Sequence, residues 1–182
     1  TNIGSWDIDR SRSWKAGKCG IVNKHGGYEL CWGLGDSGER TYITSYTYTN
    51  LMHAHPDADA IRHVFLDADV SPKPDKAYLT IEAEEDSVRF TEENSGIWGF
   101  RFGGELGFDN GKMVAYNDES FGSSGAMYIM CRFDEGLCEP DIQETDSFET
   151  KKEQAFEGSD YVGGYDDDDD EGFWAHVFMV IG

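Results

Sequence analysis

The sequence predicts an all-β fold, an antiparallel β-sandwich or jelly roll of about nine or ten strands with one or two short helices. Apolar and polar residues alternate with a period of two along most of the chain, which is the period of a half-buried strand. The 182 residues also include 22 glycines, above the usual share of about 7%, as expected where tight turns join many short strands. The length suggests a single domain over residues 1–182.

The expected strands are separated by turn residues. A hairpin over residues 17–34 turns at Asn23–Gly27. The turn at Asp109–Lys112 contains Asn-Gly, the pair that favours the type I′ geometry matching strand twist. Further strands are expected over residues 42–48, 76–84, 88–90, 98–102, 127–133 and 173–181. The last of these is apolar on both faces, which predicts a central strand.

Helix signals are few. Pro56 and the two aspartates that follow it predict a short helix of about two turns, because proline fits the first helical position and acidic residues complement the helix dipole. Residues 146–149 resemble a capping box ahead of a second helix over residues 150–156. Gly158 suits the position that ends this helix.

The formal net charge of −21 is concentrated in one part of the chain. Residues 134–171 carry sixteen acidic residues against two lysines, and we expect them to form an acidic, partly helical insertion before the last strand. This charge excludes a nucleic-acid partner, because phosphate binding needs basic residues.

The acidic segment ends in a run of six carboxylates. The run consists of Asp166, Asp167, Asp168, Asp169, Asp170 and Glu171. Adjacent carboxylates repel one another, so they either stay in water or are neutralised by a cation. Ca²⁺ suits such a cluster because it takes six to eight oxygen ligands and tolerates irregular loops. We therefore expect a structural Ca²⁺ here, with a solvated acidic loop as the alternative.

Four cysteines permit three pairings, of which local spacing favours one. A turn over Asn23–Gly27 places Cys19 opposite Cys31, where a cross-strand bridge is possible. Cys131 and Cys138 bracket a short loop. We expect the disulfides Cys19–Cys31 and Cys131–Cys138, and the alternative is four buried thiols in a cytosolic protein.

The first residue, Thr1, is not methionine, which suggests that a targeting segment has been removed; a cloning artefact is the alternative. Together with two disulfides this predicts a secreted, extracellular protein. No apolar run approaches the roughly 18 residues that a membrane span requires, so none is expected.

Residues His53 to Ile61 read His-Ala-His-Pro-Asp-Ala-Asp-Ala-Ile. This segment resembles the first metal motif of cupins, a family in which His-x-His and a downstream glutamate bind a transition metal inside a β-barrel. The resemblance implies a metal at His53 and His55, although Ala60 stands where the family has its glutamate. A helix entered at Pro56 explains the same residues without metal.

Aromatic residues are frequent in the predicted strand over residues 42–48. Tyr42, Tyr46 and Tyr48, with Trp32 and Trp98, could form a platform on which a sugar stacks. The other interpretation is that these side chains fill a sandwich core.

These observations predict a secreted, disulfide-stabilised binding or structural module without catalytic activity. Its partners would be other protein subunits, in an extracellular assembly that includes self-association, or a carbohydrate. One alternative is a lectin-like module that binds carbohydrate through exposed aromatic residues. A second alternative is a cupin-like, metal-dependent enzyme.

Overall fold

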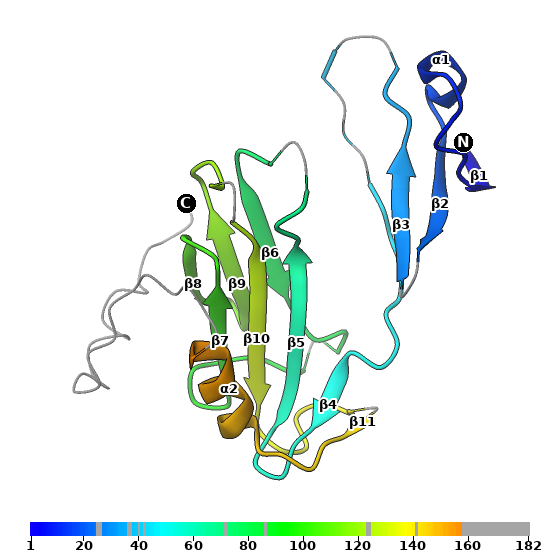
Figure 1. The fold of residues 1–182 in the computed structure, drawn as a ribbon. Helices are drawn as coiled ribbons and strands as arrows, with labels where there is room; N and C mark the ends of the chain where they lie inside the picture. The colour runs from blue at the N-terminus through cyan, green and yellow to red at the C-terminus, as the bar shows by residue number, and fades with distance from the viewer. Residues whose placement is uncertain are drawn as a thin grey trace. The chain divides into compact units, whose positions relative to one another are not determined.

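The computed structural model describes residues 1–24, 27–35, 38, 39, 41, 43–70, 73–85, 87–122, 125–140 and 142–157. Its contacts divide the chain into two compact units, unit 1 over Thr1–Tyr46 and unit 2 over Thr47–Gly182. The described residues form eleven strands in three sheets and two short helices (Figure 1). The all-β class is confirmed, and no closed barrel or jelly roll is seen in this part of the chain. That the whole chain is one domain stays a prediction.

Unit 1 contains one small sheet. Its elements are β1 (Asn2–Ser5), α1 (Arg12–Lys15), β2 (Cys19–Lys24) and β3 (Gly27–Trp32). The strand order is β1-β2-β3, with β1 parallel to β2 and β2 antiparallel to β3. The predicted hairpin over residues 17–34 is therefore confirmed.

The register of this hairpin differs from the prediction by one residue. Lys24 pairs with Gly27, so that only two residues separate the strands, and Cys19 pairs with Trp32 while Cys31 pairs with Gly20. Two-residue loops are the commonest hairpin connections because their twist matches that of the strands. A shift of one residue turns every side chain to the other face. Cys19 and Cys31 therefore lie on opposite faces of the hairpin.

Unit 1 has little interior. Gly20 and Gly33 are its only buried residues within the described part. Around α1, aromatic and basic side chains pack on one another instead. The cationic groups of Arg10 and Lys18 lie 5.3 and 4.1 Å from the ring centroid of Trp14.

Unit 2 contains two sheets and one helix. The five-stranded sheet has the order β11-β4-β5-β10-β7, with β11 parallel to β4 and the other pairs antiparallel. Its strands are β4 (Met52–Ala54), β5 (Asp59–Leu66), β7 (Ser95–Phe100), β10 (Met127–Phe133) and β11 (Ile142–Gln143). The antiparallel three-stranded sheet has the order β6-β9-β8, from β6 (Ala77–Ile81), β9 (Lys112–Asn117) and β8 (Glu105–Asp109). The helix is α2 (Phe148–Glu157).

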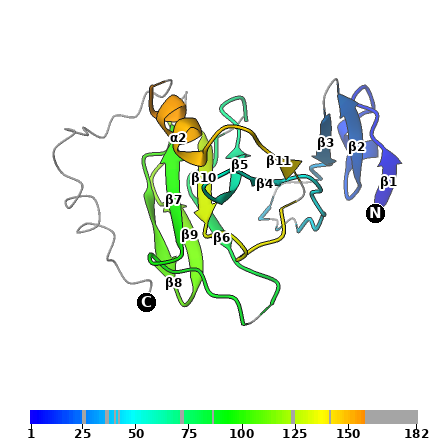
Figure 2. The same ribbon diagram turned by 90° about the horizontal axis from the view of Figure 1, so that it is seen from below.

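Strand β10 shows how the layers of unit 2 arise from sequence. Residues Ile129, Cys131 and Phe133 are fully buried in a cluster shared with β9 of the three-stranded sheet. Met130 points to the opposite face, where it packs in a second cluster with residues of α2. Alternate side chains of one strand thus build two interiors. Unit 2 consequently has three layers, namely the small sheet, the large sheet and α2 (Figure 2).

Helix α2 attaches to the large sheet through an apolar stripe. Phe148, Ala155 and Phe156 pack in the second cluster, and their spacing places them on one helix face. The second helix is confirmed, but it begins two residues earlier than predicted and its cap is Ser147, whose hydroxyl accepts a hydrogen bond from the Thr150 amide at 3.1 Å. The carboxylates of the predicted capping box pair with lysines instead, Asp146 with Lys151 and Glu149 with Lys152. Gly158, the predicted end of the helix, lies outside the described residues.

Three local predictions differ from the structure. No helix follows Pro56; instead β4 and β5 form a hairpin in which the His55 amide donates to the Ala58 carbonyl at 2.8 Å. Ala58 and Ala60 are buried under α2, and this tertiary packing outweighs the local helix signal. Two predicted strands are also not formed, namely residues 88–90 and the described residues of 42–48. The expected strand 173–181 lies outside the described residues.

The Asn-Gly turn is confirmed. Asn110 and Gly111 join β8 to β9 with φ angles of 49° and 81°. Positive φ at both positions is the requirement of a type I′ turn, which asparagine and glycine meet at low cost.

Candidate functional site

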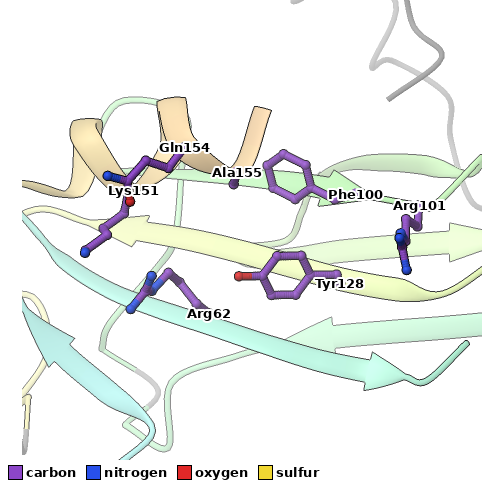
Figure 3. Close-up of a pocket in the computed structure, with 7 residues that line it drawn as sticks. All are labelled: Arg62, Phe100, Arg101, Tyr128, Lys151, Gln154 and Ala155. Carbon is purple, nitrogen blue, oxygen red and sulfur yellow. The ribbon is translucent and has the colours of Figure 1, made fainter. Parts of the chain in front are cut away.

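A pocket of about 330 Å³ lies between α2 and the large sheet of unit 2 (Figure 3). This volume is at the lower end of the range for small-molecule sites. Strands β5, β7 and β10 supply its floor and helix α2 supplies one wall. The residues that line it are Arg62, Phe100, Arg101, Tyr128, Lys151, Gln154 and Ala155.

The strand register explains why these residues meet. Phe100 of β7 pairs directly with Tyr128 of β10, and their ring centroids are 5.6 Å apart. Arg62 of β5 pairs with Met130, two residues further along β10 and on the same face as Tyr128. On α2, residues 151, 154 and 155 are spaced by three and four positions, which places them on one side of the helix. Together they surround a half-enclosed space above the sheet.

The described lining residues include three cations and no carboxylate. The Lys151 ammonium pairs with Asp146 at 2.5 Å. Arg62 and Arg101 form no ion pair with any carboxylate in the described chain. The pKa of Glu144 is lowered mainly by its hydrogen bond to His53, and the charge of Arg62 adds a smaller effect. The carboxylate of Glu144 is itself held by His53 Nδ1 at 2.7 Å. The pocket is therefore a positively charged place in a very acidic protein.

Arg101 holds an unusual backbone conformation. It follows the last residue of β7 and has a φ of 54°, a left-handed value that costs a non-glycine residue roughly 1–2 kcal/mol. Its carbonyl accepts a hydrogen bond from the Ala126 amide at 2.9 Å, which helps to hold the turn. This conformation directs the chain away from the strand at the point where the Arg101 side chain lines the pocket.

The wall formed by α2 is fixed from the β4–β5 hairpin. The carboxylate of Asp57 accepts hydrogen bonds from the first two amides of the helix, Phe148 at 2.6 Å and Glu149 at 3.2 Å. Burial alone would raise the pKa of Asp57, but these two amides and the nearby His55 hold the pKa below its ordinary value. The anionic carboxylate thus caps the positive end of the helix dipole.

His55 makes a second contact to the start of α2. Its Nδ1 lies 2.8 Å from the Asp146 carbonyl oxygen, and because a carbonyl only accepts, Nδ1 must carry the proton. The side chain is 8% exposed, and its Nε2 is buried with no hydrogen-bond partner within the described residues.

The two histidines of the cupin-like motif therefore both have partners in the segment that joins β11 to α2. His53 binds Glu144 and His55 binds the Asp146 carbonyl. Among the described residues, no group of three or more His, Cys, Asp or Glu side chains could hold a metal ion. The predicted Ca²⁺ run, residues 166–171, lies outside them, so a Ca²⁺ site there stays a prediction.

All four cysteines are thiols in the structure. The prediction that Cys19 lies opposite Cys31 was wrong by one residue, as described above. Cys131 and Cys138 contribute to the same hydrophobic cluster, and the bridge between them stays a prediction. Burial raises the pKa of Cys131, and burial together with the charge of Asp59 raises the pKa of Cys138 to about 11. Neither thiol is suited to act as a nucleophile.

The expected tyrosine platform is only partly described. Tyr42 lies outside the described residues. Tyr46 belongs to unit 1 and Tyr48 to unit 2, and they are 64% and 56% exposed. Tyr48 contacts the ring of His63, with centroids 5.1 Å apart. A sugar site at Tyr42, Tyr46 and Tyr48 stays a prediction.

No protein-family model, curated protein or solved structure matches this chain. In the described part of the chain, none of the helices has the length and apolar character that crossing a membrane would need.

Sequence reasoning missed the pocket. Arg62, Arg101 and Lys151 are far apart in the chain, and no local motif surrounds any of them. The net charge of −21 argued against an anionic ligand. That argument missed the pocket because a total charge does not show where the few basic residues lie. One usable signal was Lys151 and Lys152, the only basic residues in the acidic segment.

Proposed function

We propose that this chain is a secreted, non-catalytic binding module, and that the pocket of unit 2 binds a small organic anion. The observation that carries the proposal is the presence of two guanidinium groups, Arg62 and Arg101, without ion-pair partners in the described chain. The sequence offers 36 acidic residues to 15 lysines and arginines. Among the described residues no carboxylate forms an ion pair with these two side chains, so both are available to an anionic ligand.

The chemistry of the lining supports binding. Guanidinium groups present several donors in a fixed geometry that matches carboxylate and phosphate. Phe100 is 2% exposed and supplies a rigid apolar floor, while the hydroxyl of Tyr128 and the amide of Gln154 add polar contacts. An anion would also relieve the repulsion among the three cations. These groups can hold and orient an anion in a pocket open to solvent.

A panel of small carboxylates and phosphates, screened by thermal shift, tests the proposal. We expect at least one class to raise the melting temperature of the full chain above that in sodium chloride of equal ionic strength. Arg62→Gln should remove the increment. Arg132→Gln is the matched control, because Arg132 lies on the same sheet, pairs with Asp134 at 3.0 Å and does not line the pocket. An increment that survives Arg62→Gln would exclude this pocket as the site.

A second candidate function is self-association as a subunit of an extracellular assembly. The observation that favours it is the exposure of apolar side chains in unit 1, where Tyr28 is 76% and Ile43 is 89% exposed. Exposed apolar surface of this kind marks interaction sites. Analytical ultracentrifugation of the wild-type chain and of Ile43→Asp tests it. A monomer at high concentration would contradict this function and leave the pocket proposal unaffected.

A further inference from the structure

The cations of the pocket gather at its two ends. In Figure 3, Lys151 and Arg62 lie at one end and Arg101 at the other. The rings of Phe100 and Tyr128 lie between them. A ligand with a single anionic group would neutralise only one end. A ligand that carries negative charge at both ends would therefore fit this arrangement better.

The two arginines reach the pocket from opposite sides of β10. Arg62 on β5 is level with Met130 of β10. Phe100 on β7 is level with Tyr128, and Arg101 follows Phe100. Arg62 therefore lies at the level of Met130, two residues of β10 away from the level of Tyr128 and of the end of β7. Arg101, the first residue after β7, lines the pocket at the opposite end from Arg62 (Figure 3).

The part of the pocket formed by Phe100 and Ala155 is apolar. Phe100 is buried against Tyr128 and against Phe156, whose ring centroid is 5.1 Å away. The methyl group of Ala155 lines the same region from α2. A polar spacer would lose its hydration here without gaining an equal number of partners. The spacer that fits is a hydrocarbon chain or a ring.

We infer that the pocket selects an organic dianion, a dicarboxylate whose two acid groups are separated by an apolar spacer. The inference rests on the proposed function and names the ligand class of the same site. One carboxylate binds Arg62 and Lys151, and the other binds Arg101. Lys151 can serve this end although it already pairs with Asp146, because an ammonium has three donors.

Isothermal titration of the full chain with linear α,ω-dicarboxylates and with monocarboxylates of equal length tests the inference. Adipate, pimelate and suberate vary the spacing, and heptanoate is the monoanionic match of pimelate. We expect the best dicarboxylate to bind at least tenfold tighter than its monocarboxylate. Arg62→Gln and Arg101→Gln should each weaken dicarboxylate binding about tenfold. Each should change the affinity for the monocarboxylate about twofold at most, since the other end of the pocket stays intact.

The controls are Arg132→Gln and Arg89→Gln, two basic side chains outside the pocket, and both should keep wild-type affinity. Equal affinity for mono- and dicarboxylates, with only Arg62→Gln weakening both, would overturn the two-ended site and leave a one-anion pocket. Loss of dicarboxylate binding in the control variants would also overturn it, because the effect would then follow overall charge. Absence of binding by every carboxylate would overturn the inference, while the phosphates of the thermal-shift panel would still test the proposed function.

Discussion

Asp57→Ala is expected to destabilise unit 2 because Asp57 caps the N-terminal end of helix α2. The substitution removes the acceptor of two helix amides, Phe148 and Glu149. Loss of an N-terminal cap costs about 0.5–2 kcal/mol, and loss of a carboxylate at the positive end of the dipole costs about 0.3–1 kcal/mol. We therefore expect the free energy of unfolding to fall by about 2 kcal/mol. In a chain of this size the melting temperature would fall by roughly 4–8 °C.

The effect should depend on pH in a defined direction. The pKa of Asp57 is lower in the folded protein than its ordinary value of 3.8. A carboxyl of this kind stabilises the fold above the unfolded pKa, and its contribution is lost as the pH falls through the folded pKa. The difference between wild type and Asp57→Ala should be full at pH 7 and should shrink below about pH 4.

Urea unfolding followed by circular dichroism at several pH values is the assay. Asp69→Ala is the matched control, because the Asp69 side chain is exposed and forms no hydrogen bond or ion pair within the described chain. The reasoning would be refuted if Asp57→Ala and Asp69→Ala lost equal stability at pH 7. A deficit of Asp57→Ala that stayed constant from pH 7 to pH 3 would refute the ionic part of the cap.

Four further predictions concern other parts of the chain. Phe148→Ala should cost about 3–5 kcal/mol in urea unfolding, since this side chain is 1% exposed, and a loss below 1 kcal/mol would contradict the packing of α2. Gly111→Ala should lower the melting temperature, because φ is 81° and the added carbon would meet an arginine side chain at 2.6 Å; an unchanged midpoint would argue against the turn. Peptide mapping without reduction should recover no link between Cys19 and Cys31, and such a link would contradict the hairpin register. Ca²⁺ should raise the melting temperature beyond an ionic-strength control, and changing residues 167–169 to asparagine should abolish that gain; a gain equal to the salt control would leave the run as a solvated face.

Local patterns predicted those elements whose cause is local. Strand β10 was expected over residues 127–133 and forms over Met127–Phe133, because its alternation satisfies an interior on each face. The Asn110-Gly111 turn formed as expected because φ preference alone decides it. The polar residues 146–149 located the start of α2 to within two residues, although the cap is Ser147 and not the ends of the predicted capping box.

Predictions failed where distant residues decide the structure. Pro56 and its aspartates carry a helix signal, but Asp57 caps a helix that lies ninety residues later in the chain. The hairpin of unit 1 is displaced by one residue because a shorter loop matches strand twist better than the expected one. The pocket could not be predicted at all, since Arg62, Arg101 and Lys151 meet only through the register of β5, β10 and β7 and the docking of α2.

The most direct test of the anion site is a chemical-shift titration by NMR with the tightest-binding carboxylate or phosphate of the panel. The account predicts saturable shifts at the Arg62 and Arg101 side chains, the Tyr128 ring and the Ala155 methyl group, all with one dissociation constant. Resonances of unit 1 should stay in place. Saturable shifts confined to residues outside the pocket, or none at these four side chains at millimolar ligand, would contradict the claim that this pocket binds an anion.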